Sequence, residues 1–588
     1  MTRTLAAETT SKISETVSLS GWVNSRRDHG GLIFIDLRDH TGIVQLVINP
    51  ENAEAFALAE SLRDEFVITA TGVVKERDEG LKNPNLETGS VEVVTSELVL
   101  LNKSEPLPVA VHDDGQQSSE ELRLKYRYLD LRRPKMQQRL RQRANMYRRM
   151  HEYMDAQDFI EVTTPILANS SPEGARDFLV PARLHPGRFY ALPQAPQQFK
   201  QLLMVGGVPR YYQLAAAFRD EDARADRLYG EFYQLDVEMA FVSDGETIRQ
   251  LMEPLITQLA TDFAGKTLLS SDIPRIPYKQ AMEEYGSDKP DLRFGMKLIE
   301  LTDELESTGF GVFKNTIASG GAVKAIRVEG GAGLSRSQID SFTDIAKSEG
   351  AGGLAYISYE NGEAKSPIAK FLSADELVAI KDKTGAQDGD TLFFGADARD
   401  VVNKVLGRLR SEFATHFNLK DPNVIALAWI VDFPFYELDE KTGKLDFGHN
   451  PFSMPRGGSE AIDATENKLD IVADQYDMVM NGYEICSGGV RNHNPETLYK
   501  VFDVLGYDKA YVEAKFGAMI NAFKYGAPPH AGCAFGIDRM FMELVGEDNI
   551  REVVAFPKNG SGVDAMMSSP SIVDAKQLDE LSLKILEK

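Results

Sequence analysis

The sequence predicts an α+β protein of several domains, with a small β-barrel followed by a larger domain that an insertion interrupts. Residues 16–100 consist mainly of short β-rich runs broken by Gly, Asp and Asn, and a long amphipathic helix begins near residue 136. Between about residues 288 and 412 the pattern changes to short strands, glycine clusters and acidic helices, which is typical of an inserted domain. With 588 residues, 43% apolar, the chain has material for several cores and does not resemble a disordered chain.

The N-terminal barrel is predicted from five strand-like runs and one helix. The strands are expected at residues 16–24, 31–38, 42–48, 66–74 and 90–100, and the helix at residues 51–62. Five strands with one interposed helix fit a Greek-key barrel of the OB type, which commonly binds oligonucleotides. A barrel with no nucleic-acid role is the alternative that these residues leave open. We place this domain at residues 1–104 and a linker at residues 105–120.

The long helix has one apolar stripe, and the segment that leads into it and forms its first half is strongly basic. The stripe recurs every three or four residues and comprises Met136, Leu140, Ala144, Tyr147, Met150 and Met154. Residues 121–151 hold eleven Lys and Arg side chains against two acidic ones, a net charge of +9 in a chain whose net charge is −24. The overall acidity disfavours non-specific coating of nucleic acid, whereas the basic segment favours a specific anionic partner. A strand is expected after the helix, at residues 159–163.

Cysteine usage and hydropathy limit the class of protein. Cys486 and Cys533 are the only cysteines, with no CxxC pair, so a structural zinc site is disfavoured and two buried free thiols are expected. The longest apolar run, residues 424–431, is far too short to span a membrane, and the first residues lack an apolar signal core. The sequence therefore predicts a soluble, cytoplasmic protein with no membrane partner.

Two segments concentrate the residues that could carry chemistry. Residues 218–227 alternate in charge between two apolar strand-like runs, 211–218 and 232–240, which indicates a hairpin with inward-facing polar side chains. A solvated ladder of ion pairs is the alternative for such a run. Residues 526–539 form a Gly-rich strand that enters a helix with Arg539 at its start, a favourable position for a phosphate. The chain has no GxxxxGK[ST] sequence, so nucleotide chemistry here would not use a P-loop.

These segments carry a resemblance to a known family. Together with residues 170–177 (SSPEGARD) and 197–200 (QQFK), they resemble the motifs of the class II aminoacyl-tRNA synthetases and occur in the same order. Over essentially its full length, the chain resembles the bacterial aspartyl enzymes of that class. Motif 1 is the helix at 136–155 with the strand ending at Pro165, motif 2 the hairpin at 219–221, and motif 3 residues 536–539. The resemblance implies a catalytic domain with an antiparallel sheet flanked by helices, built from residues 121–287 and 413–558. The α+β insertion at 288–412 resembles that of the bacterial enzymes, and 559–588 form a C-terminal extension.

The resemblance implies that L-aspartate attacks the α-phosphate of ATP, giving aspartyl-adenylate and pyrophosphate before transfer to tRNA. Such a reaction requires positive charge around the phosphoryl oxygens and little covalent help. Catalytic roles fall to Arg219, on the α-phosphate and the substrate carboxylate, to Glu221, and to Arg539, on the γ-phosphate. Phe232 would stack on adenine, with Arg539 on the other side. The remaining ATP-binding residues implied are Asp220, Glu484, Gly536, Ile537 and Asp538.

A metal site and an aspartate pocket are also implied. Asp477 and Glu484 would ligate Mg²⁺, the alternative being an ordinary pair of strand carboxylates. Lys200 and Arg491 would bind the substrate side-chain carboxylate, so that asparagine leaves two buried cations short of one negative charge. The resemblance gives the other aspartate-binding residues as Arg219, Glu173, Gln197, Gln234 and Asp236, the last four as acceptors for the ammonium group, with His449 closing the site.

The barrel would then read the anticodon of tRNA. Phe34 is a candidate to stack on a base and Gln45 to bond its edge, with Arg26 and Arg27 as phosphate or base contacts. Without the resemblance, Phe34 would be interpreted as a core residue of the barrel. His29 and Gly80 match the form of the family that charges both tRNA-Asp and tRNA-Asn.

The leading hypothesis is therefore a homodimeric aspartate–tRNA ligase of protein biosynthesis that charges both tRNAs, with a tRNA-dependent amidotransferase as a further partner. Three alternatives stay open: a strictly tRNA-Asp-specific enzyme, an asparaginyl or lysyl enzyme of the same subclass, and a non-catalytic tRNA-binding paralogue. The paralogue predicts the loss of motif arginines or metal carboxylates. All of these are present: Arg219, Glu221, Glu484, Arg491 and Arg539.

Overall fold

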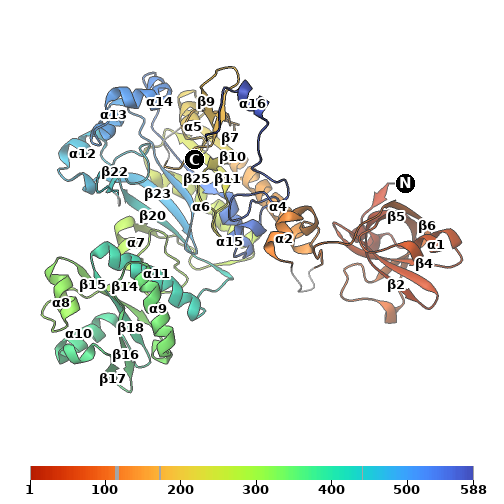
Figure 1. The fold of residues 1–588 in the computed structure, drawn as a ribbon, viewed down its shortest axis with the longest axis horizontal. Coiled ribbons are helices and arrows are strands. Elements are labelled where there is room, and N and C mark those ends of the chain that lie inside the picture. Colours follow the sequence, from red (N-terminus) through yellow and green to blue (C-terminus); the bar gives the residue numbers. More distant parts are fainter. Residues whose placement is uncertain (1, 113–117, 171–173, 440–441, 587–588) are drawn as a thin grey trace. The chain divides into compact units, whose positions relative to one another are not determined.

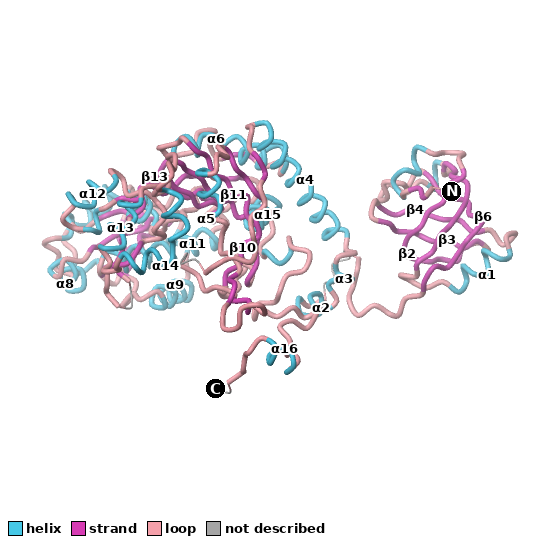
Figure 2. The backbone as a smooth tube through the Cα atoms, turned by 90° about the horizontal axis from the view of Figure 1, so that it is seen from above, coloured by secondary structure: helices cyan, strands magenta, loops and turns pink. Residues whose placement is uncertain are grey.

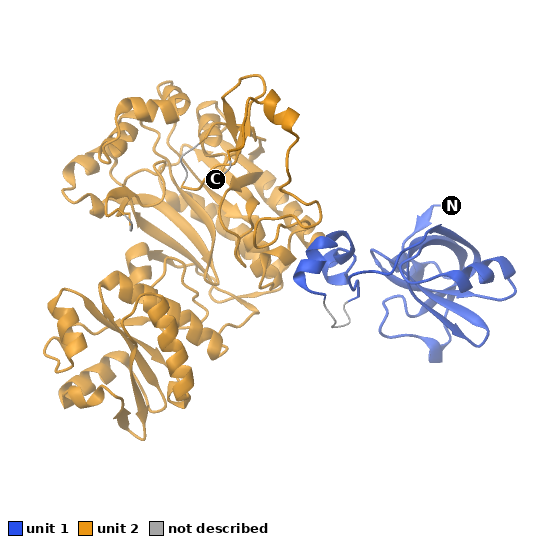
Figure 3. Cartoon of the chain, viewed as in Figure 1, with its two compact units in different colours: residues 1–138 blue, residues 139–588 orange. Residues whose placement is uncertain are grey.

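The structure is a computed structural model that describes residues 2–112, 118–170, 174–439 and 442–586. It divides into two compact units, residues 1–138 and residues 139–588, which are described separately below (Figure 3). Within the described residues, no helix combines the length and the apolarity that a membrane span requires.

The first unit contains a closed five-stranded barrel. Its strands follow the order β2, β3, β4, β6 and β5, and pairing of β2 with β5 closes the circle, which confirms the OB-type prediction. Burial alternates along β3, where Ile33 and Ile35 enter the core and Phe34 and Asp36 face outward. The elements are β1 (Arg3–Thr4), β2 (Thr16–His29), β3 (Leu32–Asp39), β4 (Gly42–Ile48), α1 (Ala53–Ser61), β5 (Val67–Glu76) and β6 (Val91–Asn102).

Two short helices, α2 (Glu120–Lys125) and α3 (Arg127–Asp130), follow the barrel and account for much of the basic segment. The carboxylate of Asp130 is buried, accepts hydrogen bonds from Arg127 (2.6 Å) and Arg133 (3.2 Å), and lies 3.7 Å from a nitrogen of Arg123. These three arginines are themselves buried. They therefore stabilise the fold of this unit and are not a footprint for an external anion.

Three further arginines of the basic segment also bind internal carboxylates. Arg132 pairs with Glu65 at 2.9 Å, Arg139 with Glu547 at 2.8 Å and Arg143 with Asp538 at 2.5 Å. The prediction that the +9 segment is chiefly a surface for an anionic partner is thus wrong for six of its eleven basic residues. Three of these arginines share one buried carboxylate within the segment, that of Asp130, and the other three pair with carboxylates far away in the sequence, which a local charge count does not include.

The second unit is organised around an eight-stranded, mostly antiparallel sheet. Its order is β13-β20-β23-β24-β25-β11-β10-β7, and only the edge pairs β13–β20 and β10–β7 are parallel. Helices pack on this sheet (Figure 1), which confirms the predicted antiparallel sheet flanked by helices. The strands are β7 (Ile160–Glu161), β10 (Arg210–Arg219), β11 (Gly230–Ala240), β13 (Arg275–Pro277), β20 (Leu427–Pro434), β23 (Val472–Met480), β24 (Tyr483–Val490) and β25 (His530–Gly536).

Helix α4 (Pro134–Ala156) buries a stripe that differs in part from the predicted one. Met146, Met150 and Met154 are fully buried in the core beneath the sheet, together with α6 (Gly245–Gln258) and α15 (Ile537–Val545). Ala144 is exposed and Leu140 only half-buried. The strand after the helix is shorter than predicted, because only Ile160–Glu161 pairs with β10.

The insertion forms a five-stranded sheet with helices on both faces (Figures 1 and 2). One apolar core lies under α8 and α10 and a second under α9 and α11. The elements are β14 (Leu298–Glu300), α8 (Gly311–Ala318), β15 (Ala322–Val328), α9 (Arg336–Ser348), β16 (Ala355–Glu360), β17 (Glu363–Lys365), α10 (Ala374–Thr384), β18 (Thr391–Asp397) and α11 (Arg399–His416). The insertion therefore has the cores of a domain in its own right.

The remaining elements of the second unit surround the central sheet. Helices α13 and α14 share an apolar core with β21 and β22. These elements are β8 (Leu179–Pro181), β9 (Phe189–Ala191), α5 (Gln197–Val205), β12 (Thr267–Leu268), α7 (Tyr278–Tyr285), β19 (Val424–Ile425), β21 (Tyr436–Leu438), β22 (Leu445–Phe447), α12 (Gly458–Ala464), α13 (Pro495–Asp503), α14 (Lys509–Phe523) and α16 (Ala575–Glu580).

Candidate functional site

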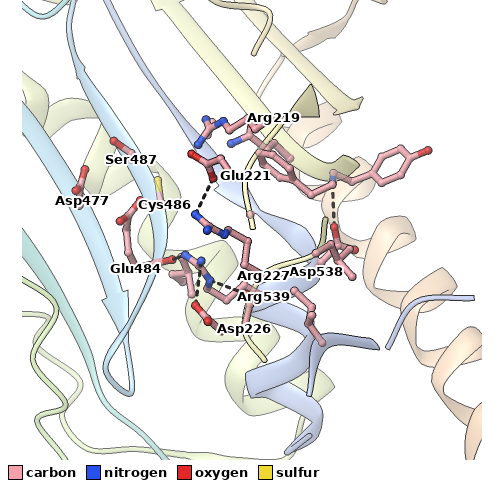
Figure 4. Close-up of a pocket in the computed structure, with 18 of the residues that line it drawn as sticks. Arg219, Glu221, Asp226, Arg227, Asp477, Glu484, Cys486, Ser487, Asp538 and Arg539 are labelled. Atoms are coloured by element: carbon pink, nitrogen blue, oxygen red, sulfur yellow. Dashed lines mark hydrogen bonds and ion pairs between the residues drawn. The ribbon is translucent and has the colours of Figure 1, made fainter. Parts of the chain in front are cut away.

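A cavity of about 310 Å³ opens where the predicted motif 2 hairpin meets the start of α15. Strand β11 lies between β10 and β25, with Gln234 opposite Gly536, so the sheet brings the two motifs together. Most of the residues predicted for ATP line this cavity (Figure 4). They are Arg219, Glu221, Phe232, Glu484, Gly536, Asp538 and Arg539, while Asp220 lies beside them in the hairpin and Ile537 is buried in the core.

Arg219 ends β10 and faces the cavity. Its guanidinium lies 5.1 Å from the centroid of the Phe232 ring, a cation–π distance. Its Nε is buried and makes no hydrogen bond within the described residues. Arg219 is thus the cation placed over Phe232 in the free protein, and it has a donor available for a ligand. The predicted place of Arg539, on the far side of a bound adenine, stays a prediction.

Arg539 is held by the hairpin loop and by β24. Its Nη1 donates to the backbone carbonyl of Glu484 (2.7 Å), its Nε to that of Asp226 (3.2 Å), and its Nη2 lies 3.2 Å from the Asp226 carboxylate. Arg227 of the same loop donates to Glu221 at 2.7 Å (Figure 4). Sequence reasoning missed Asp226 and Arg227, although both lie in the alternating charges of residues 218–227. A polyphosphate that binds Arg539 must compete with the Asp226 carboxylate.

Asp477 and Glu484 project from neighbouring strands into the cavity (Figure 4). Burial and the nearby Glu484 carboxylate raise the pKa of Asp477 well above its ordinary value. Its Oδ1 is buried and finds no hydrogen-bond donor within the described residues. An orphaned carboxylate oxygen beside a second carboxylate fits a hard divalent cation such as Mg²⁺. The described residues contain no cluster of three metal-ligating side chains, so further ligands would come from substrate or water.

Lys200 and Arg491 are buried, as predicted, but they already bind two carboxylates. Lys200 Nζ lies 2.6 Å from Asp236 and 3.3 Å from Glu238, and Arg491 donates both Nε and Nη2 to Glu238 at 3.0 and 3.2 Å. Burial opposes the charge of Glu238, but Arg491 and Lys200 hold its pKa below the ordinary value. The two cations are therefore not short of negative charge, which corrects the charge count made from sequence.

Glu238 was missed, yet its position carried a signal. Gln234, Asp236 and Glu238 alternate with the apolar Leu235 and Val237 along β11, so all three face the same side of the sheet. Asp236 Oδ2 and Gln234 Oε1 are buried and accept no hydrogen bond within the described residues. These two free acceptor oxygens lie beside a cluster of two cations and two carboxylates, and they fit the ammonium group predicted from the sequence for both residues.

The other residues predicted for aspartate are placed less directly. Gln197 donates its Nε2 to Gln201 Oε1 at 3.0 Å, so the orientation of its amide is set by α5, and its predicted role as an acceptor stays a prediction. His449 lines the cavity as an exposed side chain at its rim, with its ring edge-on to Phe433 at 4.9 Å. Glu173 lies outside the described residues.

The pKa of Asp236 predicts a pH dependence of aspartate binding. Burial raises this pKa above its ordinary value, and Lys200 only partly offsets the effect. A raised pKa means that Asp236 takes up a proton at a higher pH than an ordinary aspartate and then loses its attraction for an ammonium group. KM for aspartate is expected to rise as the pH falls, by up to about tenfold per pH unit below that pKa. Steady-state kinetics from neutral pH downwards measure this, and Asp236→Asn should bind aspartate weakly and without the pH dependence.

The barrel brings three of the predicted anticodon residues onto one outer face. Arg27 is opposite Phe34 in the β2–β3 ladder, and Asp36 is opposite Gln45 in the β3–β4 ladder. Phe34 is half-buried and faces away from the core, so the alternative that it is a core residue is wrong. Arg26 lies opposite the core residue Ile35, on the other face.

Arg77 is a barrel residue that sequence reasoning missed. It donates to the carbonyl of Val91 at 2.9 Å and lies 3.7 Å from Glu92, while its Nη2 is buried without a hydrogen-bond partner among the described residues. Burial lowers the pKa of Arg77, and Glu92 and Asp36 oppose this. A buried, unused guanidinium donor on a nucleic-acid-binding fold is a candidate contact for a base or phosphate.

The two residues predicted to relax tRNA selection lie in exposed positions. His29 ends β2, and Gly80 belongs to a short 3₁₀ turn (Glu79–Leu81). A Cβ added to Gly80 would meet no described atom within 4 Å. Both positions are open to a ligand, and neither is needed for packing.

Comparison with known proteins gives two family matches. The family described as tRNA synthetases class II (D, K and N) matches residues 119–560, and the OB-fold nucleic acid binding domain matches residues 17–101. The Aspartate–tRNA(Asp/Asn) ligase of Pelodictyon phaeoclathratiforme is 51% identical over 569 residues, which cover 97% of this chain and 94% of the relative. That of Acidiphilium cryptum is 51% identical over 571 residues, covering 97% and 95%.

Solved structures share the fold. Asparaginyl-tRNA synthetase from Pyrococcus horikoshii, complexed with asparaginyl-adenylate, has a TM-score of 0.58 at 19% identity, covering 96% of this chain and 99% of that one. Aspartyl-tRNA synthetase from Entamoeba histolytica has a TM-score of 0.57 at 19% identity, covering 95% and 92%. At this identity, the likeness concerns the architecture alone.

Proposed function

Because this chain belongs to the class II tRNA synthetases of the D, K and N group, we propose that it is an aspartate–tRNA ligase that charges both tRNA-Asp and tRNA-Asn. The observation that carries the choice of amino acid is the buried cluster of Lys200, Arg491, Asp236 and Glu238, which adjoins the cavity through Gln234 on β11. The choice of tRNA rests on His29 and Gly80 and on relatives named for both tRNAs.

In the first reaction, an α-carboxylate oxygen of aspartate bonds to the α-phosphorus of ATP and the bond to the bridging oxygen of pyrophosphate breaks. Arg219 binds the α-phosphate and the attacking carboxylate, which reduces the repulsion between the two anions. Arg539 releases the Asp226 carboxylate and binds the γ-phosphate in its place. Phe232 stacks on adenine. Glu221 keeps Arg227 and the hairpin loop in position over the nucleotide.

The residues Asp477 and Glu484 would hold Mg²⁺. When bound, the ion neutralises phosphate charge and orients the leaving pyrophosphate. Without a cation at this site, burial and then the Glu484 carboxylate raise the pKa of Asp477.

Aspartate is selected by its fit to the buried charges. Asp236 Oδ2 and Gln234 Oε1 accept the ammonium group, and Lys200 and Arg491 turn their remaining donors to the side-chain carboxylate. Glu238 fixes the Arg491 fork through two parallel bonds, and this pre-orients the guanidinium. Asparagine would offer these donors a neutral amide oxygen in place of a carboxylate, and a hydrogen bond to a neutral acceptor is weaker than one to an ionised acceptor.

In the second reaction, a ribose hydroxyl at the 3′ end of tRNA attacks the aspartyl carbonyl and AMP leaves. The barrel face of Phe34, Gln45 and Arg27, with Arg77 as an added contact, supplies anticodon recognition by stacking and hydrogen bonds to unpaired bases.

The experiment that tests the proposal is aspartylation of tRNA-Asp and tRNA-Asn transcripts side by side. For a relaxed enzyme we expect kcat/KM values within about tenfold of each other, because no bulk at His29 or Gly80 penalises the third anticodon base. A tRNA-Asn that accepts aspartate more than about a thousandfold less well would instead establish the strict alternative. His29→Leu should lower charging of tRNA-Asn selectively, and His40→Leu, in the exposed turn after β3, is the matched control.

Further parts of the proposal concern assembly and location. We infer a cytoplasmic homodimer, with an amidotransferase as partner for misacylated tRNA-Asn. The dimer is supported by Ile160, Ile166 and Leu167, three apolar side chains after α4 that are 51%, 51% and 53% exposed in the single chain. ATP–pyrophosphate exchange with aspartate, asparagine and lysine separates this enzyme from its asparaginyl and lysyl alternatives and from a non-catalytic paralogue.

A further inference from the structure

Arg143, on α4, reaches from the helix to the wall of the ATP cavity. Its Nη2 lies 2.5 Å from Asp538 Oδ1, its Nε and Nη2 contact the Tyr147 hydroxyl at 3.1 and 2.8 Å, and its Nη1 donates to the carbonyl of Val553 at 3.4 Å. The side chain is 14% exposed and that of Asp538 3%, so the ion pair is largely withdrawn from solvent.

Asp538 transmits this contact to two elements that bind ATP. Its second oxygen, Oδ2, accepts the backbone N–H of Tyr233 at 2.9 Å, next to Phe232 on β11. It also precedes Arg539 directly in the first turn of α15. One carboxylate therefore fixes the strand that carries the adenine-stacking ring and the helix that carries the γ-phosphate arginine.

The pair also separates two cavities. Asp538 lines the ATP cavity and, together with Arg143 and Tyr147, a second cavity of about 430 Å³ along α4. Leu228 and Tyr233 line both cavities as well, so the ion pair is one part of the wall between them. Removing one partner of a buried ion pair leaves an uncompensated charge, and we expect Asp538 without Arg143 to turn away from the ATP cavity. Space to turn exists on the side of the second cavity.

We propose that Arg143 is a positioning residue for ATP, which acts by holding Asp538 so that Phe232 and Arg539 keep their spacing across the nucleotide site. This inference rests on the proposed function and adds to it a residue outside the binding site. It assigns to α4 a part in nucleotide binding besides its burial in the core. Arg143 touches neither the substrate nor the reacting atoms in this role.

The test compares Arg143→Met, Arg143→Lys and Arg139→Met in aspartate-dependent ATP–pyrophosphate exchange. Arg139 is the matched control, because it lies one turn earlier on α4, is also 14% exposed, and pairs with Glu547, which follows α15 and does not line the ATP cavity. We expect KM for ATP to rise at least tenfold in Arg143→Met with KM for aspartate within twofold of wild type. Arg143→Lys should recover KM for ATP to within threefold, and Arg139→Met should leave both KM values within twofold.

Several results would overturn the inference. One is a KM for ATP within twofold of wild type in Arg143→Met, and another is an equal rise in both KM values, which indicates a general loss of structure. Equilibrium binding of Mg·ATP to the same proteins is measured in parallel. If the wild-type protein shows no exchange activity, the proposed function is contradicted, and the effect of Arg143 on ATP binding is still tested by the binding measurement. If Arg143→Met does not fold, Asp538→Asn keeps an acceptor for Tyr233 and removes the ion pair. Unchanged ATP affinity in that variant also refutes the role.

Discussion

Arg539→Ala is expected to lower kcat/KM for ATP in aspartate-dependent exchange by about 10³-fold, or ~4 kcal/mol of transition-state stabilisation. Arg539 presents three donors at the cavity wall, and in the free protein they bind the Asp226 carboxylate and two backbone carbonyls. A triphosphate replaces the carboxylate with a more highly charged group. The attraction between Arg539 and the triphosphate becomes stronger in the transition state, because negative charge moves to the leaving pyrophosphate.

The measurement is exchange at saturating aspartate with varied ATP. Arg539→Lys keeps the charge but loses the planar fork, and we expect it to recover only part of the activity. Arg408→Ala, which removes an exposed arginine paired with Glu412 on α11 of the insertion, is the control for loss of a surface charge. Retention of full exchange activity by Arg539→Ala would refute the assignment to ATP.

Lys200→Met is expected to lower kcat/KM for aspartate by about 10²- to 10⁴-fold and to abolish the preference for aspartate over asparagine. Lys200 and Arg491 balance Asp236 and Glu238 in a space where all four side chains are at most 6% exposed. Without the lysine, the cluster carries one excess negative charge and repels the substrate side chain. Removing one member of a buried ion pair typically costs about 3–5 kcal/mol.

Exchange with aspartate and with asparagine gives the ratio of the two kcat/KM values, and thermal unfolding gives the stability. Lys324→Met is the matched control, since Lys324 is also fully buried and binds Glu283 and Asn403 between the insertion and α7. It should lower the unfolding temperature to a similar degree and leave the ratio unchanged. A Lys200→Met enzyme that still prefers aspartate would show that the buried charges do not set specificity.

The sequence was sufficient for features that depend on local pattern. The barrel followed from five short β-rich runs with one interposed helix, and the residues of the ATP cavity followed from motifs whose order resembles that of the class II synthetases. Features that depend on long-range pairing were not predictable in this way. Glu238 acquires its role from Arg491, some 250 positions away, and Asp226 acquires its own from Arg539.

The basic segment illustrates the same limit from the opposite side. Its net charge of +9 is correct as a count, yet Asp130, Glu65, Glu547 and Asp538 bind six of its arginines. A charge count along the chain records which residues are present and not which are already neutralised. Only the folded arrangement distinguishes a binding surface from an internal network.

The insertion lies in the connection between two neighbouring strands at the edge of the catalytic sheet. Strands β13 and β20 are parallel neighbours, although one ends at residue 277 and the other begins at residue 427. Parallel neighbours require a crossover connection, and here that connection contains a domain with two cores of its own. The entropy of closing a loop grows only with the logarithm of its length, and a folded insert removes most of that freedom in advance. The crossover is therefore a position at which chain length can change greatly while the catalytic sheet keeps its strand order.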